Sequence, residues 1–280
     1  MSRLNVAKEW QQRYYEVLIY IQNNLDENLS LERLSEIAGL SSFHFHRQFK
    51  SDCGESLHDH IKRLRLEKAA FIISNTESSI TDVCYLSGYE SPSSFSKAFK
   101  NHFGKAPRAY RNNELTSNDV SDEYAVVPSI VRLNDRHVYF HREIGPYQEA
   151  AERAWSSLFP QAYQLGIISN QCQAIGITYD SPYVTQSRHI RYDACVVLSE
   201  KYDFISASQI QMISGGVFAV FRHIGAYKNI DKLYDYIYGQ WLPQSGKALR
   251  DQAAFCHYHQ MHPKEVPDEQ LVTDAYIPLA

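Results

Sequence analysis

The sequence has few cysteines, and they are widely scattered. Its 280 residues contain five of them, Cys53, Cys84, Cys172, Cys195 and Cys256, with no Cys-x-x-Cys pair. An odd, scattered set argues against a disulfide framework and against a cysteine-based zinc site. We therefore expect reduced thiols.

Long hydrophobic runs are missing as well. No stretch approaches the roughly 18 apolar residues that a membrane helix needs, and the start of the chain lacks the apolar segment of an export signal. With 44% hydrophobic and 21% charged residues, the composition is that of a globular protein rather than a disordered or fibrous one. We expect a cytoplasmic protein without membrane contact, and its length favours two domains.

The net charge is only −4, but charge is unevenly distributed along the chain. Residues 45–111 hold 11 basic and 7 acidic side chains, whereas the part after residue 115 is acidic overall. Basic side chains neutralise the phosphates of nucleic acids. This excess predicts phosphate contacts in the first part of the chain.

Helix start and stop signals follow each other closely in the first part. Ser30 precedes an amphipathic stretch that stops at Gly39, and a second stretch places Phe45 and Phe49 on one face before stopping at Gly54. Two short helices joined by a glycine turn are typical of a helix-turn-helix motif.

The same pattern returns fifty residues later, with Gly88 as the turn. The matching pairs are Phe45/Phe95, Phe49/Phe99, Lys50/Lys100 and Gly54/Gly104. Between the two motifs, the residues from about 56 to 76 have helical spacing and predict a long connecting helix. We predict an all-α domain with two helix-turn-helix motifs over residues 1–112, followed by a polar linker over residues 113–128.

The remainder, residues 129–280, contains a second duplication at an offset of eighty. Ile144-Gly145-Pro146-Tyr147 matches Ile224-Gly225-Ala226-Tyr227, and each copy follows a strand-like run and precedes a helical one. Two strand-like segments complete each copy. The pattern predicts an α+β domain of duplicated β-α-β-β units, with an antiparallel sheet, helices on one face and a ligand-sized concavity where the units meet.

Both second helices of the helix-turn-helix motifs carry polar side chains opposite their phenylalanines. Such side chains can read base edges or bind phosphates, although the solvated side of any amphipathic helix has a similar composition. The predicted DNA-binding residues are Phe43, His46, Arg47 and Lys50 in the first helix and Ser93, Ser94, Lys97 and Lys100 in the second.

Two stretches, LERLSEIAGLSSFHFHRQFKSDCGESLHDHIKRLRLEKAA and ITDVCYLSGYESPSSFSKAFKNHFGKAPRAYR, resemble the AraC/XylS family of transcription regulators, in particular its MarA/SoxS/Rob-like branch. The resemblance covers roughly residues 8–111. It implies that one polypeptide places both recognition helices in successive major-groove segments of double-stranded DNA and works with RNA polymerase. Phe43 and His46 stand where some relatives have tryptophan and glutamine, so their sequence preference does not carry over.

The second domain resembles the GyrI-like small-molecule-binding domain in segments such as IGPYQEAAERAWSSLF, AIGITYDSP and TDAYIPL. The resemblance implies a pocket for a small aromatic or lipophilic effector. Twenty tyrosines in the chain favour such a pocket, although ordinary packing accounts for most of them. The predicted effector-binding residues are Tyr147, Tyr179, Tyr227, Cys256 and Tyr258.

Cys256 departs from the GyrI-like pattern. It stands where the family usually has the glutamate of Phe-Glu-x-Tyr, and a neutral thiol does not offset the charge of a cationic ligand. Some GyrI-like proteins are hydrolases that use this glutamate, so we predict no enzyme. The alternatives to effector binding are a protein-interaction or sequestration module and a small-molecule hydrolase.

His257, His259 and His262 form an HxHxxH motif after Cys256. The first two share one face of a predicted strand and are potential metal ligands. Histidines near the end of a strand are more typically solvated, and the cysteine next to them is more typically a buried, inert thiol. We therefore predict neither a metal site nor a cofactor.

Overall fold

The chain divides into two compact units, over residues 1–114 and 115–280. The computed structural model describes residues 3–111, 126–168, 172–198, 205–260 and 265–280. The predicted linker over residues 113–128 falls outside these ranges up to residue 125, so its extent stays a prediction. No helix in the described ranges is long and apolar enough to cross a membrane.

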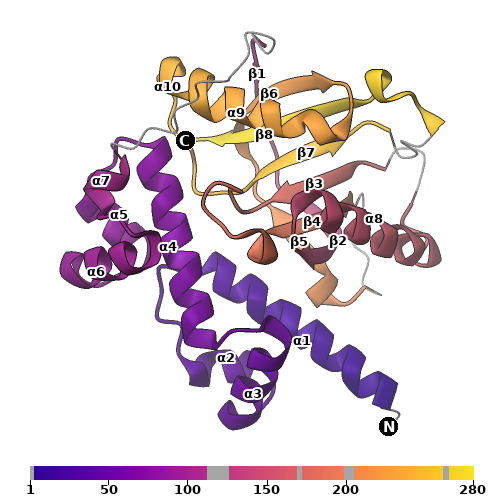
Figure 1. Cartoon of the computed structure of the whole chain (residues 1–280). Helices are drawn as coiled ribbons and strands as arrows, with labels where there is room; N and C mark the ends of the chain where they lie inside the picture. Colours follow the sequence, from indigo (N-terminus) through magenta and orange to yellow (C-terminus); the bar gives the residue numbers. More distant parts are fainter. Residues whose placement is uncertain (1–2, 112–125, 169–171, 199–204, 261–264) are drawn as a thin grey trace. The chain divides into compact units, whose positions relative to one another are not determined.

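The first unit is built from helices throughout its described part (Figure 1). They are α1 (Arg3–Asn23), α2 (Leu31–Ile37), α3 (Ser42–Cys53), α4 (Leu57–Asn75), α5 (Ile80–Leu86), α6 (Pro92–Phe103) and α7 (Pro107–Arg111). The pairs α2–α3 and α5–α6 are the two helix-turn-helix motifs, and α4 is the long helix that joins them. The all-α prediction for this domain is confirmed.

Serine caps and left-handed glycines set the helix ends. Ser30 accepts a hydrogen bond from the Arg33 backbone N at 3.1 Å, which confirms the predicted N-cap of α2. Serines cap α3, α4, α5 and α6 in the same way. Gly54 and Gly104 follow α3 and α6 with φ of 76° and 73°, a region that favours glycine.

In its described residues, the second unit holds one antiparallel sheet of eight strands and the helices that pack on it (Figure 1). The strands are β1 (Ser129–Leu133), β2 (Arg136–Ile144), β3 (Ala174–Thr178), β4 (Arg191–Val197), β5 (Ile210–Ile213), β6 (Gly216–Ile224), β7 (Ala254–Tyr258) and β8 (Val272–Leu279). The α-helices are α8 (Tyr147–Gln164), α9 (Ile230–Tyr236) and α10 (Leu242–Ser245). The α+β prediction is confirmed.

The strand order β1-β6-β8-β7-β3-β4-β2-β5 has an approximate two-fold symmetry about the β7–β3 pair. The predicted copies are β2-α8-β3-β4 and β6-α9-β7-β8. Strands β1 and β5 were not predicted, and each of them pairs with the other copy: β1 with β6, and β5 with β2. The β3–β7 pair joins the two copies into one sheet, and the exchanged strands form its two edges.

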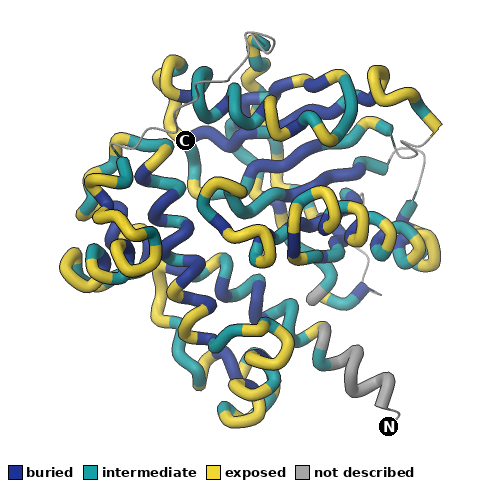
Figure 2. The backbone as a smooth tube through the Cα atoms, in the orientation of Figure 1, coloured by how far each residue is buried: buried dark blue, intermediate teal, exposed yellow. Residues whose placement is uncertain are grey.

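Helices α8 and α9 pack on the same face of the sheet, each over its own copy. Side chains of α8 share a core with β2 and β4, and side chains of α9 share one with β6, β7 and β8. Figure 2 shows the central strands as buried backbone and the outer sides of the helices as exposed.

The second of these helical segments is irregular. The sequence predicts one helix over residues 228–241, but the segment is a 3-10 turn (Tyr227–Asn229), then α9, then a π-helical turn (Ile237–Trp241). Pro243 has no backbone N–H to donate to the preceding turn, which favours such a shift in hydrogen bonding.

Candidate DNA-binding and effector-binding sites

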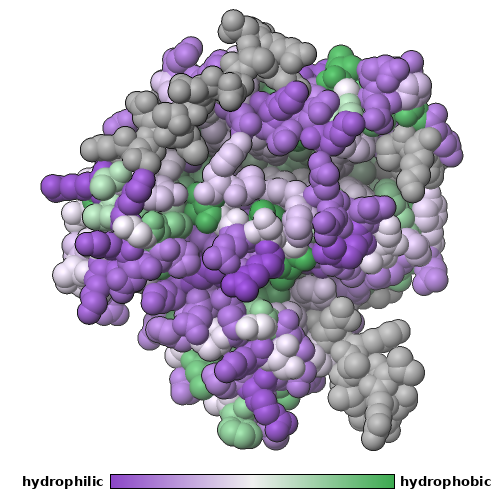
Figure 3. Space-filling view, in the orientation of Figure 1, coloured by the Kyte–Doolittle hydropathy of each residue, from purple (hydrophilic) through white to green (hydrophobic). Residues whose placement is uncertain are grey.

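Helix α3 separates a buried face from an exposed one. Phe45 and Phe49 are fully buried in the core of the first unit, whereas Phe43 is 73% exposed. The predicted contacts His46, Arg47 and Lys50 are exposed as well. In the space-filling view, hydrophilic side chains gather over α2 and α3, with isolated hydrophobic patches between them (Figure 3). An exposed phenylalanine among basic side chains suits a thymine methyl group next to phosphates.

Helix α6 repeats this division with a different exposed face. Phe95 and Phe99 are fully buried, and the predicted contacts Ser93, Ser94, Lys97 and Lys100 are all exposed. The Ser94 hydroxyl already donates to the backbone oxygen of Ser91 at 2.9 Å. Ser93 Oγ lies 3.3 Å from Ser91 Oγ. The serines therefore belong partly to the helix cap, whereas the lysines project from later turns.

The two predicted residue sets differ at one of their four positions in the repeat. At an offset of fifty, Ser94 corresponds to His44 rather than to His46. His44 is exposed and its backbone N donates to the Ser41 hydroxyl at 3.4 Å. The repeat itself was the signal that could have added His44 to the candidates.

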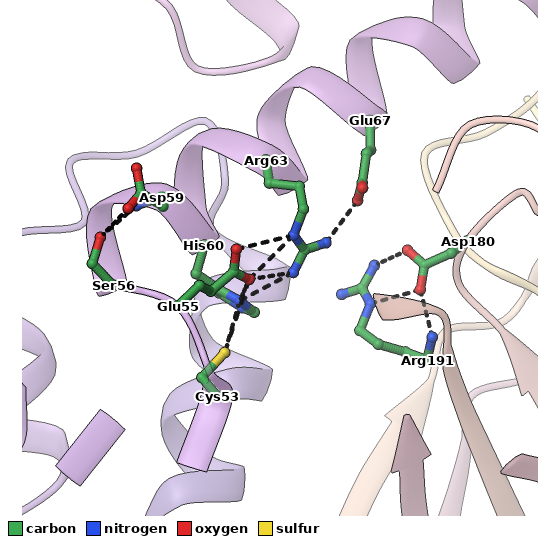
Figure 4. A network of polar contacts seen from close by, with 9 residues as sticks. All are labelled: Cys53, Glu55, Ser56, Asp59, His60, Arg63, Glu67, Asp180 and Arg191. Atoms are coloured by element: carbon green, nitrogen blue, oxygen red, sulfur yellow. Dashed lines mark hydrogen bonds and ion pairs between the residues drawn. The ribbon is translucent and has the colours of Figure 1, made fainter. Parts of the chain in front are cut away.

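A network of ion pairs joins the end of α3 to α4 (Figure 4). Arg63 donates to Glu55 Oε1 through Nη2 at 2.7 Å and to Glu67 Oε2 through Nη1 at 2.9 Å. His60 Nδ1 lies 2.9 Å from Glu55 Oε1 and 3.2 Å from Cys53 Sγ. Burial alone would raise the pKa of Glu55, but hydrogen bonds from His60 and Arg63 outweigh it and lower the pKa to about 2.

The corresponding contacts between α6 and α7 are aromatic instead of ionic. Phe103 and Tyr110 occupy the positions of Cys53 and His60 in the repeat, and their ring centroids lie 5.2 Å apart. Tyr110 also meets Phe99 edge to face at 5.3 Å. The two helix-turn-helix motifs are thus held by different chemistry, although their recognition helices have the same length and the same caps.

In the second unit, aromatic side chains from both copies meet at the β3–β7 seam on the helical face. This aromatic cluster consists of Tyr147, Trp155, Tyr192, Tyr227, Tyr234, Cys256 and Tyr258. Tyr192 and Tyr258 bring their hydroxyl oxygens to 3.2 Å across the seam, and Trp155 Nε1 donates to the Tyr192 oxygen at 3.0 Å. The ring centroids of Tyr227 and Tyr258 lie 4.9 Å apart.

Gly176 makes room for these rings. It pairs with Cys256 across the seam, and a Cβ at Gly176 would overlap the Tyr192 hydroxyl and lie 2.9 Å from Tyr258 Cε2. Cys256 Sγ in turn lies 3.4 Å from the Tyr234 hydroxyl oxygen. The close approach of the two copies therefore depends on a residue without a side chain.

Burial keeps the aromatic cluster uncharged. It raises the pKa of Tyr227 to about 12 and that of Cys256 to about 11. Tyr192 and Tyr258 shift in the same direction for the same reason. The Tyr227 hydroxyl is buried and has no hydrogen-bond partner among the described residues. The cluster thus offers neutral aromatic faces and one unused hydroxyl.

Four of the five predicted effector residues, Tyr147, Tyr227, Cys256 and Tyr258, belong to this cluster, and Tyr179 does not. Tyr179 lies on the opposite face of the sheet, where its hydroxyl donates to Asp193 Oδ2 at 2.8 Å. Its ring lies under the Arg142 guanidinium at 4.7 Å.

Other members of the aromatic cluster were not predicted from the sequence. They are Trp155, Tyr192 and Tyr234. A signal was present for one of them, because Trp155 follows Tyr147 by eight residues, a spacing that puts both on one face of a helix.

Two family models match the chain. The GyrI-like small molecule binding domain matches residues 127–280, which is more than half of the sequence, and a helix-turn-helix domain matches residues 34–113. These ranges fall on the sheet unit and on the helical unit. The predicted resemblance to both families is confirmed.

The relatives are regulators and a transposon protein. The TetD protein of transposon Tn10 from Escherichia coli is 32% identical over 117 residues, 40% of this chain and 85% of that protein. The transcriptional activator AarP of Providencia stuartii is 31% identical over 105 residues, 38% of this chain and 78% of that protein. An HTH-type transcriptional regulator of Staphylococcus aureus is 32% identical over 124 residues, 43% of this chain; the chain covers only 17% of that protein's length.

Proposed function

Since the chain belongs to the AraC-type family of helix-turn-helix transcription regulators and carries a GyrI-like small-molecule-binding domain, we propose that α3 and α6 read specific bases of double-stranded DNA under the control of a small effector. The observation that carries the proposal is the repeated helix with a buried phenylalanine face and an exposed polar face. The prediction that the chain is no enzyme agrees with relatives named as regulators.

Within this proposal the exposed residues divide into two roles. Arg47 suits the bidentate acceptor edge of guanine, and Phe43 suits a thymine methyl group. His46, Ser93, Ser94 and Lys97 complete the base-reading set. Lys50 and Lys100, one turn further along each helix, neutralise phosphates and carry no base preference.

The test is selection of binding sites from randomised duplexes by the full chain at two salt concentrations. A split motif with its halves about one helical turn apart is expected. Arg47→Ala should cost on the order of 1–3 kcal/mol at the selected site and relax base choice there, whereas Lys100→Ala should weaken all duplexes evenly. Lys232→Ala, in α9, is the control. Equal losses for Arg47→Ala on selected and random DNA would contradict its role.

We propose the aromatic cluster as the effector site, for an uncharged aromatic or lipophilic molecule. The rings supply flat apolar surface, and the unused Tyr227 hydroxyl supplies a donor for an acceptor on the ligand. With Cys256 in place of a carboxylate, the cluster offers no countercharge for a cation.

Two probes separate neutral from cationic ligands. 2-Naphthol should raise the Tm of the full chain saturably, and tetraphenylphosphonium should have little effect. Cys256→Glu should gain a response to the cation, while Cys256→Ser keeps the original preference. A response of the unmodified chain to the cation alone would contradict the neutral site. No response to either probe would favour a protein-interaction or sequestration module, and turnover of a probe would favour a hydrolase.

RNA polymerase is the protein partner that we propose at the DNA site. The name of AarP as a transcriptional activator supports this choice. Transcription in vitro from a template carrying the selected motif, with and without the full chain, tests it. Equal transcript levels at saturating protein would contradict a direct role.

A further inference from the structure

Strand β7 carries potential metal ligands on the face opposite the aromatic cluster. His257 in β7 pairs with Asp274 in β8, and His259 follows two residues later on the same side. The rings of His257 and His259 have centroids 4.4 Å apart, and His259 Nε2 lies 2.8 Å from Asp274 Oδ2. One ligand atom from each of the three residues lies within 4.8 Å of the other two. His262, the third histidine of the motif, lies outside the described residues.

The first copy shows what this place in the sheet needs for structure alone. There Ile177 and Tyr179 stand at the positions of His257 and His259, at an offset of eighty. The Tyr179 hydroxyl donates to a buried aspartate, Asp193, at the same 2.8 Å. A buried aspartate at this place in the sheet therefore needs no histidine beside it for structural reasons. The second copy nevertheless has two histidines there.

We propose that His257, His259 and Asp274 bind a divalent first-row transition metal ion such as Zn²⁺. Two imidazole nitrogens and one carboxylate oxygen are a ligand set that such ions prefer, with water in the remaining positions. Ligands about 2.0–2.1 Å from one tetrahedral ion lie roughly 3.4 Å from each other. The three side chains reach that spacing by small movements.

Arg222 competes with the metal for Asp274. It donates to both carboxylate oxygens, at 2.8 and 2.9 Å, but its side chain is 58% exposed and can turn into solvent. Arg136 also lies near His257, and its charge opposes the ion.

The other cluster with suitable ligands in the described ranges, Cys53, Glu55 and His60, is less suited to a metal. The Arg63 side chain is only 10% exposed there and is held between Glu55 and Glu67. It cannot leave for solvent as Arg222 can, so an ion would sit beside a fixed positive charge.

The test is a Co²⁺ titration of the full chain, followed by visible absorption and by competition with Zn²⁺. One equivalent should bind with the d–d bands of nitrogen and oxygen ligands and without thiolate charge transfer. Asp274→Asn and His257→Gln should each weaken binding at least about tenfold. Arg222→Gln should tighten it, because it removes the competing cation, and a misfolded variant would not bind more tightly. His137→Gln, at an exposed histidine of β2, is the control.

Two results would overturn the site. The first is a Co²⁺ affinity that Asp274→Asn and His257→Gln leave unchanged. The second is a thiolate charge-transfer band that Cys53→Ser abolishes, which would place the ion at the α3–α4 joint. Neither result bears on DNA binding or on the response to 2-naphthol, so this inference and the proposed function stand or fall separately.

Discussion

The two copies in the sheet unit contain the same cross-strand pair in two different environments. Arg142 donates to Asp193 at 2.7 and 2.8 Å, and Arg222 donates to Asp274 at 2.8 and 2.9 Å. The first pair is buried, with 1% and 0% of its side chains exposed, whereas Arg222 is 58% exposed. The two pairs therefore have nearly the same hydrogen-bond distances but differ in their exposure to solvent.

The surroundings differ because the first pair is covered by a ring and Asp193 accepts further hydrogen bonds. Tyr179 and Gln211 both donate to Asp193, and the Tyr179 ring covers the guanidinium. At the second pair, His259 takes the place of Tyr179. An ion pair that is buried on both sides is costly to break, whereas a pair whose arginine reaches solvent contributes less. The Arg142–Asp193 pair is therefore a structural element, whereas Arg222 can release Asp274 to another partner.

Removal of each arginine should show the largest difference between the two pairs. Arg142→Met should lower the free energy of unfolding of the sheet unit by about 3–5 kcal/mol, because Asp193 would keep a buried charge without its partner. Arg222→Met should cost less than about 1 kcal/mol. Urea unfolding of both variants, followed by near-UV circular dichroism, measures the difference. Losses of similar size would mean that burial does not distinguish the two pairs.

A methyl group at the seam tests how closely the copies must approach each other. Gly176→Ala should cost about 1–3 kcal/mol, because the new Cβ would meet Tyr192 and Tyr258. Cys256→Ala, at the symmetry-related position, removes an atom instead and should cost about 1 kcal/mol. Differential scanning calorimetry gives both values. A Gly176→Ala variant as stable as the unmodified chain would show that the rings have space to move apart.

Acid unfolding gives the smallest expected effect. Burial alone would raise the pKa of Asp274, but hydrogen bonds from Arg222 and His259 outweigh it and lower that pKa. The stabilisation is therefore present above the unfolded pKa of about 3.9 and is lost as pH falls through the lower folded value.

Arg222→Gln should remove part of this acid sensitivity. Urea midpoints of the variant and the unmodified chain, measured between about pH 5 and pH 2.5, should converge at the acid end. Midpoints that stay parallel over the whole range would show that Arg222 does not hold the Asp274 charge.

Much of the fold could be predicted from local signals in the sequence. Ser30 and the glycines at 54 and 104 set helix ends through one or two hydrogen bonds with near neighbours, so a single chain segment contains the whole cause. The repeats at fifty and eighty residues gave the two motifs and the two copies. The buried faces of α3 and α6 followed from the spacing of their phenylalanines.

The candidate sites could be predicted only in part. The exposure of the DNA-binding candidates follows from helical periodicity, but their roles depend on a duplex. Four effector candidates belong to the aromatic cluster: two of them end the repeated motif, and the other two lie on β7. Tyr179 lies on the other face because alternate residues of a strand point to opposite sides of the sheet. The register of β3 depends on its pairing with strands far away in sequence, so it could not be predicted locally.

The sequence alone was enough to predict the class of each unit, the duplications and several helix ends of the first unit, because these depend mainly on interactions between neighbours in the chain. Only the tertiary structure decided that β1 and β5 are exchanged between the copies, that Gly176 and Cys256 meet at the seam, and that Asp274 joins His257 and His259. Pairing between distant strands depends on how the whole sheet packs and curls. The free energy of that pairing comes from residues far apart in sequence, so no single segment predicts it.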